Sequence, residues 1–230
     1  MITSMLVARK LIVVALVAVV GLLVWAVGWS SLFAVAAVDV QAPATVSAAQ
    51  VRAAVGDLAG VPLARVDLSR VQARVEQIPT VASATVTRSW PRTLQVVVVA
   101  RVPVVALKSG GSTALVDSSG SIISTVATPP LGLPLLRTGA PAGTVLDVHT
   151  PNAMAAISVA ALLPVDLRSK VVTVGAVGVE DVRLTLIGGA LVRWGGTGEA
   201  LLKSSVLRAL LKHPARVYDV SAPKLPTTRS

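Results

Sequence analysis

A charge-free stretch near the N-terminus constrains this chain more than any other feature. After Arg9 and Lys10, no charged residue occurs until Asp39. Residues 11–33 are almost entirely apolar, and a helix needs roughly 20 such residues to cross a bilayer. The sequence therefore predicts a single transmembrane helix over residues 11–33, preceded by a cytoplasmic tail over residues 1–10.

The basic pair Arg9 and Lys10 sets the expected orientation. Basic residues that flank a membrane helix stay on the cytoplasmic side, so we expect the bulk of the chain to be extracytoplasmic. A cleaved signal peptide is the alternative, because Ala34 and Ala36 fit a small-residue cleavage site. Such peptides have an apolar region of roughly 7 to 15 residues, which is shorter than the run found here. Both interpretations export the rest of the chain.

Charge and composition narrow the classes of partner. The chain has 21 Lys and Arg against 11 Asp and Glu and no cysteine, which excludes disulfides and thiolate metal sites. Without Arg9 and Lys10 the balance is 19 basic to 11 acidic residues, a net charge of +8. The basic residues are dispersed, and a single Phe and a single Tyr offer little for base stacking. Nucleic-acid binding is thus disfavoured, whereas an anionic wall polymer stays open as a ligand.

Residues 36–103 contain elements in the order strand, helix, helix, strand, strand. Residues 38–41 alternate apolar and polar side chains, which predicts a short strand. Ser47 is placed to cap a helix that we expect to end at Gly60, and Asp67 to cap a second helix that stops before Pro79. Residues 81–88 and 93–102 are rich in β-branched side chains and predict two strands joined by a turn at residues 89–92.

The turn between these last strands carries a recognisable signature. Its residues follow the pattern R-x-W-P-x-T-L, and R-x-P-V comes shortly afterwards; the positions are Arg88, Trp90, Pro91, Leu94, Arg101 and Pro103. With the preceding order of elements, this pattern resembles the FtsQ/DivIB family of bacterial cell-division proteins. Ala100 departs from it, because the family usually has glutamate there. The resemblance implies that residues 36–103 form a POTRA domain, a small module that docks other chains.

The remaining folded part, residues 104–223, reads as a β domain with two helices. Short strands are expected at residues 104–107, 113–117 and 121–123, and again at 171–177, 181–187, 191–194 and 216–220. The helices are expected at residues 150–163 and 198–212. The fold class is therefore α+β, with a mixed or antiparallel sheet in this domain. Residues 224–230, which contain two prolines and small polar residues, are expected to be disordered.

The final predicted strand is the candidate docking site. It resembles the family's terminal I-D-V-S-x-P segment, and the resemblance implies that an FtsB-like protein, with an FtsL-like protein attached to it, binds at Tyr218, Asp219, Val220 and Ser221. A short strand at a sheet edge is suited to pairing with a partner strand, and tyrosine is favoured at binding hot spots. The alternative, that Tyr218 and Val220 simply pack the sheet, stays open.

No catalytic motif supports an enzyme. The glycine clusters at residues 188–189 and 195–198 lack P-loop spacing, neither histidine lies in HExxH, and GxSxG is absent. We expect no catalytic, cofactor-binding or metal-binding residues. The sequence indicates a non-enzymatic, single-pass divisome scaffold in the cell membrane at the division septum, linked through its partners to septal peptidoglycan synthases, with no nucleic acid and no small-molecule substrate. The alternatives are a POTRA-type adaptor for another envelope assembly and an exported binder of anionic wall polymer.

Overall fold

The computed structural model describes residues 13–22, 25, 31–137 and 147–230, and the chain divides into two compact units, Met1–Ala100 (unit 1) and Arg101–Ser230 (unit 2). The predicted tail at residues 1–10 and part of the predicted membrane helix lie outside the described residues. Residues 13–22 are helical, and their large apolar side chains are exposed. Within the described part of the chain, no helix is both long enough and apolar enough to cross a membrane.

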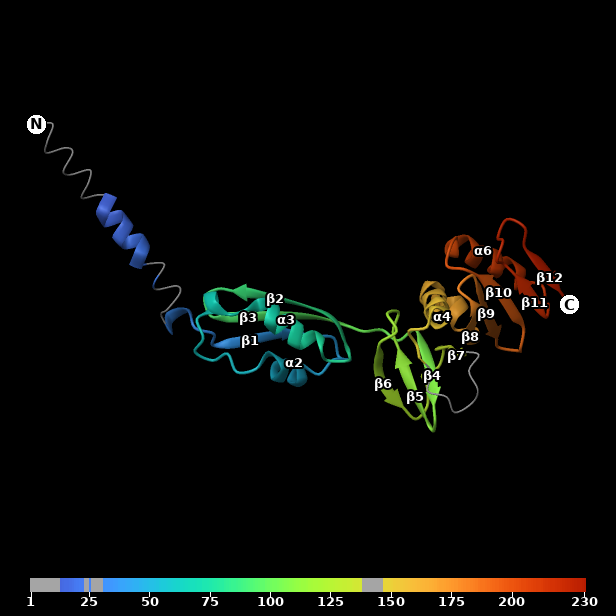
Figure 1. The fold of residues 1–230 in the computed structure, drawn as a ribbon, viewed down its shortest axis with the longest axis horizontal. Helices are drawn as coiled ribbons and strands as arrows, with labels where there is room; N and C mark the ends of the chain where they lie inside the picture. The colour runs from blue at the N-terminus through green and yellow to red at the C-terminus, as the bar shows by residue number, and fades with distance from the viewer. Residues whose placement is uncertain (1–12, 23–24, 26–30, 138–146) are drawn as a thin grey trace, which may run out of the picture. The chain divides into compact units, whose positions relative to one another are not determined.

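Unit 1 has the predicted order of strands and helices (Figure 1). Its three-stranded sheet has the order β1-β3-β2, with β1 parallel and β2 antiparallel to the central β3. Buried side chains of both helices, such as Val51 and Val75, join Leu94 and Val96 of β3 in one apolar core. The elements are β1 (Ala37–Gln41), α2 (Ala48–Val55), the 3-10 turn η2 (Leu63–Arg65), α3 (Leu68–Glu76), β2 (Val81–Ser89) and β3 (Thr93–Ala100).

Local capping determines where the two helices of unit 1 begin. The side chain of Ser47 accepts a hydrogen bond from the amide of Gln50, and Asp67 accepts one from Arg70, which confirms both predicted N-caps. The end predicted for the first helix was wrong. α2 stops at Val55 because Gly56 adopts φ +79°, a left-handed conformation that glycine adopts without steric cost.

Unit 2 is built on a nine-stranded mixed sheet in the order β12-β11-β10-β9-β8-β7-β4-β5-β6. β7 is parallel to both β4 and β8, β10 is parallel to β11, and the other pairs are antiparallel. The strands are β4 (Val105–Ser109), β5 (Ser112–Val116), β6 (Ile122–Val126), β7 (Leu135–Arg137), β8 (Val171–Gly178), β9 (Asp181–Leu186), β10 (Leu191–Gly195), β11 (Val217–Asp219) and β12 (Thr227–Arg229). Sequence reasoning missed β7 and β12.

Helices α4 (Pro151–Leu162) and α6 (Ala200–Leu210) confirm the two predicted helices of unit 2, and the four-residue α5 (Val165–Arg168) is additional. Side chains from α4 and α6 pack with the sheet in one core whose largest members include Trp194, Ile157, Leu184 and Leu207. Thr150 caps α4, and Pro151 occupies its first turn. The α+β class is confirmed.

Candidate functional site

Arg88 of the signature ties β2 to the turn between the two helices of unit 1. Its Nε donates to the carbonyl oxygen of Leu63 at 2.7 Å, and one Nη donates to the carbonyls of Val66 at 2.7 Å and Ala64 at 3.3 Å. These acceptors belong to η2 and the residue after it. Arg88 is therefore a structural residue of unit 1, and its partners lie 22 to 25 positions away in sequence.

The other signature residues of the hairpin differ in burial. Leu94 is fully buried in the core of unit 1. Trp90 is half exposed, and its ring contacts that of Phe33 edge to face, with centroids 5.8 Å apart. The Trp90–Pro91 peptide bond is cis. Trp90 and Pro91 lie in the turn between β2 and β3. The contact with Phe33 places Trp90 beside the segment that precedes β1.

Arg101 forms an ion pair within unit 2. Its Nη1 lies against the carboxylate of Asp117, which also accepts hydrogen bonds from the Ser119 hydroxyl and from the amides of Ser119 and Ser121. Burial alone would raise the pKa of Asp117, but the bonds from Ser119, Arg101 and Ser121 together lower it. Arg101 thus anchors the start of unit 2 to the β5–β6 turn, two residues before the half-buried Pro103.

The structure places two of the four predicted partner-binding residues in the core. Tyr218 is 4% exposed and Val220 is fully buried. The Tyr218 hydroxyl donates to the carbonyl of His213 at 3.0 Å and accepts from the amide of Ala215 at 2.9 Å, so it fixes the loop between α6 and β11. The side chains of Tyr218 and Val220 therefore pack the sheet and are not exposed to a partner.

Asp219 and Ser221 lie where β11 ends. The Asp219 carboxylate accepts hydrogen bonds from the amide and the hydroxyl of Ser221 at 3.0 and 2.6 Å. It also faces Arg193 of β10 at 3.8 Å. Ser221 is exposed and Asp219 is partly exposed. These two residues are the ones of the predicted set whose side chains reach solvent.

The expected disorder of residues 224–230 was wrong. Residues Thr227–Arg229 form β12, which pairs antiparallel with β11 (Figure 1). The register places Thr228 opposite Tyr218. β11 is therefore not the edge of the sheet, because β12 lies outside it. The reversal is possible because a turn closed by the amide of Leu225 and the carbonyl of Ala222, at 2.9 Å, directs the chain back along β11.

The burial of one lysine in unit 2 was not predicted from the sequence. Lys203 of α6 is 4% exposed, and its Nζ donates to the carbonyl of Gly196 at 2.9 Å and lies 6.0 Å from the ring centre of Trp194. Burial lowers the pKa of Lys203, an effect that Glu180 and Glu199 oppose. This arrangement holds the glycine-rich turn between β10 and α6 in place.

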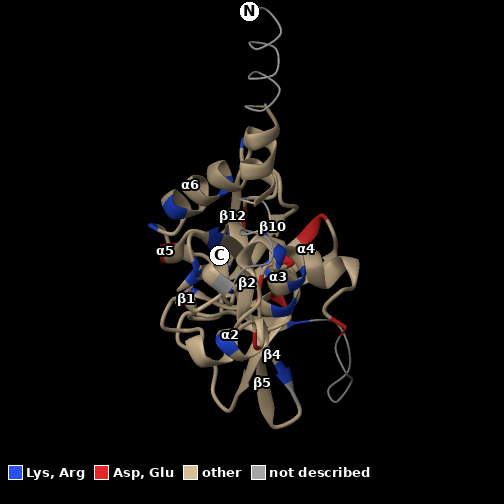
Figure 2. Ribbon diagram, turned by 90° about the vertical axis from the view of Figure 1, so that its left-hand side faces the viewer, with Lys and Arg blue, Asp and Glu red and all other residues tan. Residues whose placement is uncertain are grey.

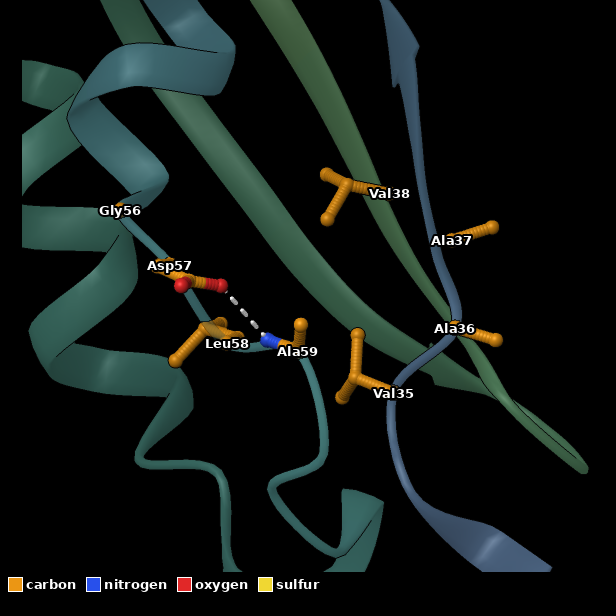
Figure 3. A pocket seen from close by; sticks show the side chains of 8 residues that line it. All are labelled: Val35, Ala36, Ala37, Val38, Gly56, Asp57, Leu58 and Ala59. Carbon is orange, nitrogen blue, oxygen red and sulfur yellow. Dashed lines mark hydrogen bonds between the residues drawn. The ribbon is translucent and has the colours of Figure 1, made fainter.

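The hollow in unit 1 offers little for chemistry. It is lined mainly by small apolar side chains from the start of β1 and from residues 56–59 (Figure 3). The single carboxylate there, Asp57, accepts a hydrogen bond from the amide of Ala59 at 3.0 Å. In the described ranges, no group of three or more His, Cys, Asp or Glu residues is placed to hold a metal ion. Figure 2 shows the Lys and Arg residues scattered over several helices and strands.

A family model matches unit 1, and known proteins match the chain across both units. The family model described as POTRA domain, FtsQ-type, matches residues 33–101, a range that contains β1, α2, α3, β2 and β3 of unit 1. The protein named "Cell division protein FtsQ" of Streptomyces collinus is 32% identical over 231 residues, covering 96% of this chain and 88% of that protein. The chain belongs to the FtsQ family of cell division proteins. The Streptomyces venezuelae FtsQ is 31% identical over 209 residues, 89% of this chain and 77% of that protein.

The relatives with higher identity are longer than this chain. The FtsQ of Mycobacteroides abscessus is 38% identical over 170 residues, which are 74% of this chain and 53% of that protein. The chain thus spans about half the length of the mycobacterial relatives that it matches. Family membership confirms the resemblance drawn from the W-P hairpin, and an FtsQ-type POTRA domain explains the strand-helix-helix-strand-strand order of unit 1.

Proposed function

We propose that this FtsQ-family chain is a non-enzymatic divisome scaffold that is anchored in the cell membrane by residues 11–33 and acts at the division septum. The exposed apolar side chains of residues 13–22 support the anchor, because they have the character of a lipid-facing helix. An anchor confines the protein to the membrane plane and raises the effective concentration of neighbouring membrane proteins. The bulk of the chain is extracytoplasmic in this proposal.

The scaffold docks FtsB-like and FtsL-like proteins at the end of the nine-stranded sheet where β11 lies, and through them reaches the septal peptidoglycan synthases. The observation that carries this proposal is the position of β11. Its inner side pairs with β10, and its outer side is covered by just three residues whose side chains are all exposed. A partner strand can pair with the backbone of β11 only where these three residues do not already pair with it, and such pairing gives affinity without any pocket for a side chain.

The backbone of β11 defines which residues would pair with a partner. The Arg216 carbonyl and the Val220 amide both bond to β10 at 2.9 Å. Because backbone groups alternate sides along a strand, those of Val217 and Asp219 point to the outer side. A proline at Val220 would thus break the inner ladder, whereas a proline at Val217 removes an outward N–H and leaves the β10 pairing intact.

The test is co-purification of the full chain, in mild detergent, with the ectodomains of the host's FtsB-like and FtsL-like proteins. Val217→Pro is expected to lose at least about tenfold in affinity for the FtsB-like ectodomain. Ile122→Pro is the matched control, because Ile122 is the first residue of β6 at the opposite edge of the same sheet. Equal affinity for both variants, or no binding by the unaltered chain, would contradict the proposal.

A second candidate function is binding of an anionic wall polymer through the net charge of +8 outside the membrane segment. Electrostatic binding of this kind weakens as salt screens the charges. A sedimentation assay of the full chain with purified wall polymer, at low and high salt, tests it. Salt-sensitive binding to the polymer together with no binding to either division protein would favour this second function.

A further inference from the structure

We propose that one face of the nine-stranded sheet binds a linear polyanion of the wall through Arg137, Arg183 and Arg193, which we call the arginine row. This inference rests on the second candidate function, the binding of an anionic wall polymer, and names its site. The three residues lie far apart in the sequence, and the sheet brings them into register. Arg137 of β7 is opposite Gly175 of β8, which is opposite Arg183 of β9. Arg183 in turn is opposite Arg193 of β10.

The arginine row lies on the side of the sheet that the helices leave open. Successive side chains of a strand point to opposite faces of the sheet. Leu136 and Val192, which are adjacent in sequence to members of the row, are buried in the core that contains side chains of α4 and α6. The arginines therefore point to the other face. Arg137 and Arg193 are exposed there, and the side chain of Arg183 is 38% exposed.

Contacts within the chain leave donors of the row for a ligand. In the described ranges, the side chain of Arg137 has no hydrogen-bond or ion-pair partner. Arg183 binds the carboxylate of Asp181 through Nε and one Nη, which leaves its other Nη for a ligand. Arg193 lies 3.8 Å from the carboxylate of Asp219, beyond hydrogen-bond distance. The planar fork of arginine binds phosphate or carboxylate groups through two parallel hydrogen bonds, so these donors fit the anionic groups of a polymer.

The row is electrostatically unfavourable without an anion. Arg183 and Arg193 are directly opposite each other on antiparallel strands, where like charges are destabilising. Asp181 offsets this repulsion in part. The hydrogen bond from Arg183 lowers the pKa of the Asp181 carboxyl, which keeps that group ionised at neutral pH. A further anionic group bound at the row would relieve the repulsion that remains.

The spacing along the row favours a chain of anionic groups over a single one. Because neighbouring strands lie about 4.8 Å apart, the backbones of Arg183 and Arg193 are about 5 Å apart and those of Arg137 and Arg183 about 10 Å. Gly175 has no side chain to separate Arg137 from Arg183, and a Cβ there would lie 2.6 Å from the carbonyl oxygen of Arg137. A small anion fits between Arg183 and Arg193, whereas a polyanion that lies across the strands contacts all three arginines.

The experiment measures binding of the full chain, in mild detergent, to purified wall polymer and to inorganic polyphosphate. The row variants are Arg137→Gln, Arg183→Gln and Arg193→Gln. The control is Arg168→Gln on α5, which removes the same charge from the side of the sheet that carries the helices. Each row variant is expected to bind either polyanion about fivefold more weakly, and the control to match the unaltered chain. Asp181→Asn, which removes a negative charge beside the row, is expected to bind about threefold more tightly.

Inorganic phosphate tests whether the row binds a chain or a single anion. Arg137→Gln is expected to weaken the binding of polyphosphate and to leave that of inorganic phosphate unchanged. An equal loss for both would overturn the row as a polymer site. Circular dichroism of every variant checks that the chain is folded.

The outcomes separate the row from the function on which it rests. If the unaltered chain binds the wall polymer and all row variants bind it equally well, the row is overturned and the second candidate function stands. If the unaltered chain does not bind the wall polymer, whether or not it binds polyphosphate, that function fails and the inference fails with it. Row variants that lose the FtsB-like ectodomain but keep the wall polymer would assign the row to an acidic protein segment and overturn the proposal.

Discussion

Replacing Arg88 by methionine tests the reason for the arginine in the signature of the β2–β3 hairpin. Methionine keeps much of the aliphatic stem and removes every donor. The two 2.7 Å bonds to Leu63 and Val66 are partly buried, whereas the 3.3 Å bond to Ala64 is exposed and contributes little. A hydrogen bond to a charged group contributes about 1.5–3 kcal/mol. Because water can reach part of this half-buried site, we expect unit 1 to lose about 2–4 kcal/mol of unfolding free energy.

Amide hydrogen exchange of β2 and β3 in the full chain measures this loss within unit 1 itself. Arg52→Met is the control, since Arg52 is exposed on α2, and a surface substitution of this kind changes stability by about 0.5 kcal/mol or less. Arg88→Lys retains the charge but not the planar fork, so its loss should lie between the two. A loss below about 1 kcal/mol in Arg88→Met, or one equal to that of the control, would refute the three-carbonyl explanation.

Three further predictions concern unit 2. Tyr218→Phe removes the hydroxyl that bonds the α6–β11 loop and should lower the free energy of unfolding by about 1–2 kcal/mol in urea titration; an unchanged midpoint would contradict this. Asp166 has its pKa lowered to about 2, chiefly by a hydrogen bond from Arg208, so the stability from this pair should be present above about pH 4 and lost as pH falls toward 2. Asp166→Asn should remove that pH dependence, and identical acid-unfolding curves would argue against it. Gly175→Ala would bring a Cβ within 2.6 Å of the Arg137 carbonyl and should cost about 1–3 kcal/mol by forcing β7 from β8, measured as a lower thermal midpoint; no shift would contradict the close approach.

Local patterns predicted the parts of the fold whose interactions are local. The N-caps at Ser47 and Asp67 were predictable because a capping side chain bonds an amide three residues away. The order of elements in unit 1 followed from apolar periodicity. The end of α2 was missed because Gly56 and Gly60 both adopt positive φ, and composition does not tell which one terminates the helix.

Interactions between distant residues could not be predicted in the same way. The pattern marked Arg88 and Arg101 as signature residues, yet gave no partner for either. Arg88 binds carbonyls, and a carbonyl is present in every residue, so no side chain marks the acceptor. Asp117 lies 16 positions from Arg101 and is one of several acidic residues that sequence alone could pair with it.

The family of the chain, its α+β class and its candidate docking strand all follow from the residues themselves, because periodicity, caps and the W-P hairpin are local properties of a sequence. Tertiary structure decided where the side chains of that strand lie. The sequence left open whether Tyr218 binds or packs, and packing of the sheet against α6 and its loop places the ring in the core. It also gave no sign of β12, because three exposed side chains leave no apolar pattern. Backbone pairing holds that strand, and the backbone is the same at every position of the chain, so that only the fold brings the two segments together.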